Sequence, residues 1–201
     1  MKRCLLWIAM CCMMKASAQS PKWDKACSRL REIAYQASYQ QFTGIIDREL
    51  RRSNGHGTHG SWIFETVRYS TTLSWPGALE TSIEHYSDQR DSINIESWQY
   101  LADFGSFTQK EQANQYFQAL AEQVEGCDIP LQDTVIVSLQ PASEDELPPT
   151  IPAGLEQALL FTIPAGNDAA ADILMMVGME KTKRGYRPFL IIENYWEKSR
   201  F

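Results

Sequence analysis

The amino-acid sequence predicts an α+β protein in which two main helices back one face of antiparallel β-sheet with about eight strands. Two observations lead to this fold class. Hydrophobic periodicity changes along the chain in the order helix, four strands, helix, four strands. Strands that occur in runs between helices, rather than alternating one by one with them, favour antiparallel meanders with helices packed on one face.

The first helix is expected to begin at Ser20 and Pro21, because a serine hydroxyl can cap the first turn and proline suits the first helical position. One buried stripe then continues to about residue 40. Its members recur at helical spacing and are Trp23, Cys27, Leu30, Ala34 and Ala37.

Four strands are expected next, with a polar, glycine-rich loop at residues 51–60 between the first and the second. The strands are residues 42–50, 62–75, 79–85 and a run that starts at 92. Trp75 and His85 share the parity of apolar residues, so Trp75 is expected in the core and His85 as a core residue hydrogen-bonded to a neighbour. The apolar parity changes after Ile95, which predicts either a bulge near Glu96 or a strand covered on both faces.

The second helix is expected after Thr108 and Glu111, which are spaced as a capping box, and Gly126 suits its carboxyl-terminal cap. Residues 140–156 are rich in proline and acidic side chains, which predicts an exposed loop. Four further strands complete the expected fold, at residues 134–139, 158–163, 173–179 and 189–195.

Residues 1–18 are predicted to be a cleaved signal peptide, and residues 19–201 a single exported domain. Two basic residues open the chain, an apolar run follows, and Ala16-Ser17-Ala18 supplies small residues at the cleavage site. The apolar run is shorter than the roughly 20 residues that span a bilayer. The protein is therefore expected in the periplasm or secreted. Lipid anchoring is disfavoured, because no small residue precedes Cys11 or Cys12.

Export also bears on the cysteines. Three of the five lie in the signal segment, which leaves Cys27 and Cys127. An even pair in an oxidising compartment predicts one disulfide bond. This bond would join the start of the first helix to the end of the second.

Charge narrows the classes of partner. Without the signal segment the chain has 16 basic and 25 acidic residues, a net charge of −9. This balance disfavours nucleic acid and anionic membrane surfaces as partners, because both are bound mainly through clustered Lys and Arg. No later stretch is long enough to span a membrane, and no cofactor is predicted. A protein or small-molecule partner in the cell envelope is expected, with its identity open.

The sharpest local feature is the stretch at residues 55–60, in which His56 and His59 stand three residues apart among glycines. Two imidazoles at this spacing can converge on Zn²⁺ or Cu²⁺. The alternative is a solvated hairpin tip, because a glycine-rich loop does not hold its side chains at fixed geometry.

Three arginines precede these histidines and form a basic island on an acidic protein: Arg48, Arg51 and Arg52. Such an island can engage a phosphate, a carboxylate or an acidic partner. Asp47 and Glu49 stand beside it, so a solvated charged surface is the alternative. Trp62 follows the loop, where an exposed ring could stack on a sugar or a protein partner.

No nucleophile-elbow, P-loop, dinucleotide-binding or calcium-loop motif occurs in the sequence. The leading hypothesis is a non-catalytic binding or accessory domain that uses Arg51, Arg52, His56, His59 and Trp62. The alternative is a metal-dependent hydrolase that uses His56 and His59. A purely structural component of the envelope is the third hypothesis.

Overall fold

The computed structural model describes residues 21–56, 63–89, 93–129, 132–137, 154–163 and 173–199, and it confirms the predicted α+β class and element order. The first half contains α2 (Pro21–Gln40), the 3₁₀ turn η2 (Thr43–Ile45), β1 (Ile46–His56), β2 (Ile63–Thr71), β3 (Glu80–Gln89) and β4 (Ile93–Asp103). The second half contains α3 (Lys110–Glu125), β5 (Gln132–Val137), β6 (Leu155–Ile163), β7 (Ile173–Thr182) and β8 (Gly185–Ser199). The predicted signal peptide and most of the predicted 140–156 loop lie outside these described residues.

All eight strands form one antiparallel sheet in the order β1-β2-β3-β4-β8-β7-β6-β5. Each group of four is a meander, and the pairing of β4 with β8 joins the two groups. Trp98 of β4 lies opposite His85 on one side and Asn194 on the other, and the register along β4 continues without a shift. Of the two alternatives for this strand, the bulge is not observed. Both faces are covered instead, because Tyr100 lies in the main core and Leu101 packs against the smaller cluster on the opposite face.

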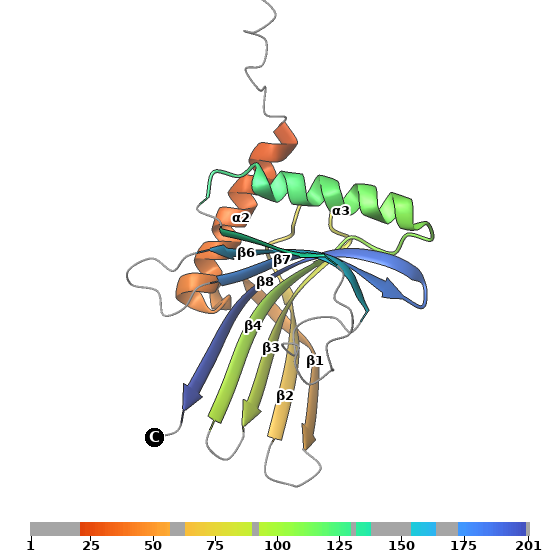
Figure 1. Ribbon diagram of the computed structural model, residues 1–201. Helices are drawn as coiled ribbons and strands as arrows, with labels where there is room; N and C mark the ends of the chain where they lie inside the picture. Colours follow the sequence, from red (N-terminus) through yellow and green to blue (C-terminus); the bar gives the residue numbers. More distant parts are fainter. Residues whose placement is uncertain are drawn as a thin grey trace, which may run out of the picture.

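Both helices pack on the same face of the sheet, where α2 and α3 contact β7 and β8 (Figure 1). The main core lies between them and the sheet, and the predicted core residue Trp75 is buried there. It includes Leu30 and Ile33 of α2 and Phe117 and Leu120 of α3. A smaller apolar cluster lies on the opposite face of the sheet and consists of Ala158, Met176, Phe189 and Ile191.

The far ends of β1 to β4 extend well past the helices (Figure 1). These are the ends at which β1 and β3 finish and β2 and β4 begin. In the described part of the chain, no helix packs against this end of the sheet. Among the described residues, the helix side of the sheet is thus not covered by a helix there.

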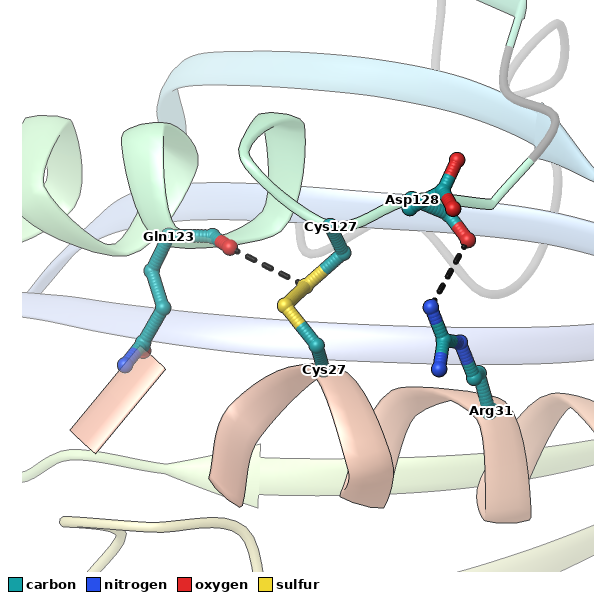
Figure 2. The surroundings of a disulfide bond; sticks show 5 residues. All are labelled: Cys27, Arg31, Gln123, Cys127 and Asp128. Carbon is teal, nitrogen blue, oxygen red and sulfur yellow. Dashed lines mark hydrogen bonds between the residues drawn. A yellow bond between two sulfur atoms is a disulfide. The ribbon is translucent and has the colours of Figure 1, made fainter. Parts of the chain in front are cut away.

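The predicted disulfide is present and joins Cys27 to Cys127 with a Cα–Cα distance of 5.1 Å (Figure 2). It connects the first turns of α2 to the residue that follows the cap of α3. A second link lies beside it, because Arg31 Nη2 donates a hydrogen bond to the backbone oxygen of Asp128 at 3.1 Å. The two helices are therefore joined covalently at one end.

Two local predictions were wrong. The capping box is not formed, because α3 begins at Lys110 and its N-cap is Gln109, which makes no side-chain cap hydrogen bond. At the other end Gly126 is the C-cap as predicted, and its N–H donates to the backbone oxygens of Glu122 and Val124.

The predicted loop at 51–60 also begins too early, because β1 continues to His56 and pairs with β2 over this length. Pairing with β2 satisfies backbone groups that a loop would expose to water. Gly55 fits this strand because a Cβ there would lie 2.2 Å from the Phe64 ring, so the missing side chain makes room for the aromatic ring.

Candidate binding face

The strand conformation of β1 separates the two predicted arginines. Side chains alternate between the faces of a strand, and Arg52 pairs with Val67 whereas Arg51 pairs with Arg68. Arg52 therefore lies on the helix side of the sheet and Arg51 on the opposite side. Arg52 Nη2 lies 2.8 Å from Glu49 Oε2, and its Nη1 lies 2.7 Å from Glu65 Oε1. The predicted basic island is thus partly neutralised by its own neighbours.

The side chains of the other predicted site residues lie outside the described structure. His56 is the last residue of β1, and its side chain is outside the described part of the structure, as are His59 and Trp62. Among the residues that are described, no group of three or more His, Cys, Asp or Glu side chains is placed to hold a metal ion. The metal-site hypothesis therefore stays a prediction.

The structure places His85 in an aromatic stack. Its ring lies 4.1 Å from the Trp98 ring at an interplanar angle of 18°, and Trp98 in turn stacks on Tyr69 at 6.1 Å and 16°. Strand alternation had indicated the correct face for His85. The expected core hydrogen bond is not observed: His85 is half-buried, and its Nε2 has no hydrogen-bond partner in the described structure.

Burial controls the charge of this stack. Desolvation lowers the pKa of His85 below its ordinary value of 6.5, and Glu96, Glu65 and Arg52 act on it more weakly. Burial likewise raises the pKa of Tyr69. His85 is therefore neutral at neutral pH, and its ring nitrogens comprise one donor and one acceptor.

Hydrogen bonds keep the neighbouring pair, Arg52 and Glu49, in their charged forms. Those from Arg52 to Glu49 and Glu65 raise the pKa of Arg52, and the bond to Arg52 lowers the pKa of Glu49. Arg52 consequently stays positively charged and Glu49 negatively charged.

A small depression of about 210 Å³ lies two residues farther along the strands than this stack. It is lined by Asn54, Glu65, Ser87 and Gln89. Asn54, Glu65 and Ser87 are neighbours across β1, β2 and β3. With its amide in the orientation that satisfies both atoms, Asn54 donates to Glu65 Oε1 at 3.2 Å. The combined surface is hereafter the His85 face, and it consists of Arg52, Asn54, Glu65, Tyr69, His85, Ser87, Gln89 and Trp98.

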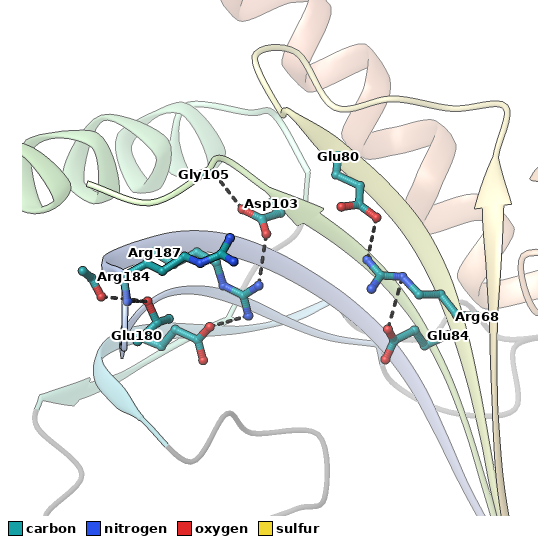
Figure 3. A network of polar contacts seen from close by, with 10 residues as sticks. Arg68, Glu80, Glu84, Asp103, Gly105, Glu180, Arg184 and Arg187 are labelled. Carbon is teal, nitrogen blue, oxygen red and sulfur yellow. Dashed lines mark hydrogen bonds and ion pairs between the residues drawn. The ribbon is translucent and has the colours of Figure 1, made fainter. Parts of the chain in front are cut away.

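The other end of the sheet carries a network of ion pairs (Figure 3). Arg68 is held by Glu80 at 2.9 Å and by Glu84 at 3.6 Å. Arg187 is held by Asp103 at 3.1 Å and by Glu180. Because each guanidinium already has two carboxylate partners, we interpret this network as a set of cross-strand links rather than a binding site.

A larger depression of about 560 Å³ adjoins these residues. It is also lined by Lys183 and Arg184, which are exposed and form no ion pair in the described structure. Exposed, flexible cations hold a ligand weakly. The smaller depression is the better candidate for two reasons. Its side chains stand on paired strands, and His85, whose Nε2 has no hydrogen-bond partner in the described structure, is two residues from Ser87 on the same face.

Sequence reasoning identified Arg52, but it missed the grouping that includes Glu65, Tyr69 and His85. The alternation of residues 79–85 gave the face of His85, and only the pairing of three strands shows what surrounds it. Comparison with known proteins returned no family model, no curated protein and no solved structure that matches this chain, so its family stays open.

Proposed function

We propose that this protein is a non-catalytic binding domain that acts outside the cytoplasm and takes its ligand on the His85 face. The observation that carries the proposal is the half-buried imidazole of His85, which stacks on Trp98 and leaves Nε2 without a hydrogen-bond partner in the described structure. This group lies on the helix side of the sheet, in register with Val67 and Trp98.

An unsatisfied buried polar atom is costly, at about 1–3 kcal/mol. Native proteins retain few such atoms, and each one calls for a physical explanation. Nε2 itself is enclosed, so a ligand gains a hydrogen bond to it only when neighbouring side chains move, and that bond would then offset this cost. The aromatic rings beside it add flat apolar surface, and the depression adds polar groups that can orient a ligand.

The non-catalytic part of the proposal rests on the state of the charged groups. Glu65 lines the depression and is held by Arg52 at 2.7 Å. A carboxylate whose oxygen is engaged by a guanidinium is poorly placed to act as a general base, because it would have to leave that contact to reach a substrate proton. Binding therefore requires less rearrangement of the site than catalysis would.

Two features support a location outside the cytoplasm. Residues 1–18 have the charge and apolar pattern of a signal peptide. The Cys27–Cys127 disulfide is of the kind that persists in oxidising compartments and is rare in the cytosol.

The test is a thermal-shift screen of the disulfide-bonded protein against sugars, nucleotides, metal ions and anions. A compound that binds the folded state raises the melting temperature by mass action. The matched variant is His85→Phe, which keeps an aromatic ring against Trp98 but removes Nε2, and the control is Lys183→Ala in the larger depression. We expect at least one compound to stabilise the wild type and the control but not His85→Phe. The proposal is contradicted if no compound stabilises the protein, or if stabilisation persists in His85→Phe.

A further inference from the structure

Resting on the proposed function, we infer that the His85 face binds a neutral carbohydrate ring rather than a charged ligand. Three properties of the face favour this chemical class of ligand: its charge balance, its hydrogen-bonding groups and the aromatic rings beside it.

Charge balance argues against an anionic ligand. Among the described residues that line the depression, Glu65 is the carboxylate, and it shares Arg52 with Glu49; the other lining residues are uncharged. Glu96, the register partner of Ser87, has an interaction partner of its own. An anionic ligand would have to draw Arg52 away from its two carboxylates to find a counter-charge, whereas a neutral ligand leaves both ion pairs intact.

The polar groups suit a ligand with several hydroxyls. The side-chain amide of Gln89 carries donors and an acceptor, and the Ser87 hydroxyl can act as either. Asn54 offers its amide oxygen as an acceptor, because its amide nitrogen already donates to Glu65 and to the backbone oxygen of Ser53. A sugar hydroxyl also donates and accepts, so neighbouring hydroxyls can match a row of such groups. The side chains come from paired strands rather than from a loop, and this fixes their spacing before the ligand arrives.

The aromatic stack lies next to the depression and offers apolar surface there, although its three rings are not among the residues that line the depression. Tyr69, Trp98 and His85 lie nearly parallel, with interplanar angles of 16° and 18°, and His85 is two residues from Ser87 on the same face. The C–H face of a pyranose ring is apolar and flat enough to pack on such a surface. The depression, at about 210 Å³, is smaller than the ~300–1,000 Å³ typical of drug-sized ligands. It therefore suits one sugar ring.

The experiment is isothermal titration calorimetry of the full disulfide-bonded chain with two sets of probes. The neutral set is glucose, galactose, mannose and N-acetylglucosamine. The charged set is glucuronic acid, glucosamine, arginine and inorganic phosphate. Three variants accompany the wild type: Gln89→Ala and His85→Phe within the face, and Lys183→Ala as a control outside it.

We expect a neutral sugar to bind the wild type and the Lys183→Ala control equally. We expect Gln89→Ala to weaken binding about tenfold, the loss of roughly one hydrogen bond, and His85→Phe to weaken it by a similar factor. Gln89 is exposed at the end of β3, so its replacement leaves the fold intact.

Two other outcomes separate the inference from the function on which it rests. Binding of only a charged probe, sensitive to His85→Phe, would overturn the carbohydrate inference and leave the binding function standing. Absence of any binding that depends on His85 would overturn both.

Discussion

The residue whose environment departs most from its sequence pattern is His85. Its parity in residues 79–85 indicates the helix side of the sheet, and the structure agrees. Parity could not show that its neighbours across the strands would be Val67 and Trp98. The sequence thus predicted the face of this side chain, whereas its half-buried state depends on contacts between distant segments.

The lowered pKa of His85 makes a prediction about stability and pH. The unfolded chain takes up a proton near pH 6.5, whereas the folded protein does so only at lower pH. The contribution of neutral His85 is therefore complete above about pH 6.5 and declines as the pH falls through the lowered pKa. We expect the melting temperature of the wild type to fall between about pH 7.5 and about pH 5.5, and that of His85→Phe to fall less.

Calorimetry of both proteins across this pH range checks the point. The other two histidines, His56 and His59, are present in both proteins, so their effects cancel in the comparison. Equal pH dependence in the two proteins would show that the folded state does not disfavour the imidazolium of His85.

At the scale of elements, the periodicity of the chain predicted every described helix and strand, and it failed mainly at their ends. β1 was cut short because it is an edge strand whose residues from Asp47 to Asn54 are exposed on both faces, so no alternating pattern marks it. The predicted capping box is absent at the start of α3, which begins at Lys110. Just before this start, Phe107 pairs with Tyr186 of β8, a contact between residues that are distant in sequence.

The link between the two helices makes a prediction at the same scale. Cys27 and Cys127 are 100 residues apart, and a cross-link of that span stabilises the folded state by about 4.7 kcal/mol in the chain-entropy model. We expect the double variant Cys27→Ala/Cys127→Ala to lose most of this free energy of unfolding. Denaturant unfolding measures it, with the reduced wild type as the control. A loss below about 1 kcal/mol would show that the disulfide does little to restrain the unfolded chain.

At the scale of the whole molecule, the sequence predicted the number and order of elements but not the partners of β4 and β8. That pairing connects two meanders that are far apart in sequence. The two helices pack on β7 and β8. The ends of β1 to β4 remain beyond the helices as a result (Figure 1). The His85 face is a consequence of this arrangement, which explains why no local motif marks it.

Mapping of backbone amide chemical shifts by NMR tests whether ligands bind on the His85 face. The probe is each compound that raises the melting temperature of the wild type. We expect the shift changes to gather at residues 52–54, 65–69, 85–89 and 96–98, which the sheet brings together. Changes that gather instead around the larger depression, at residues 79–80, 103–106 and 182–187, would contradict the account.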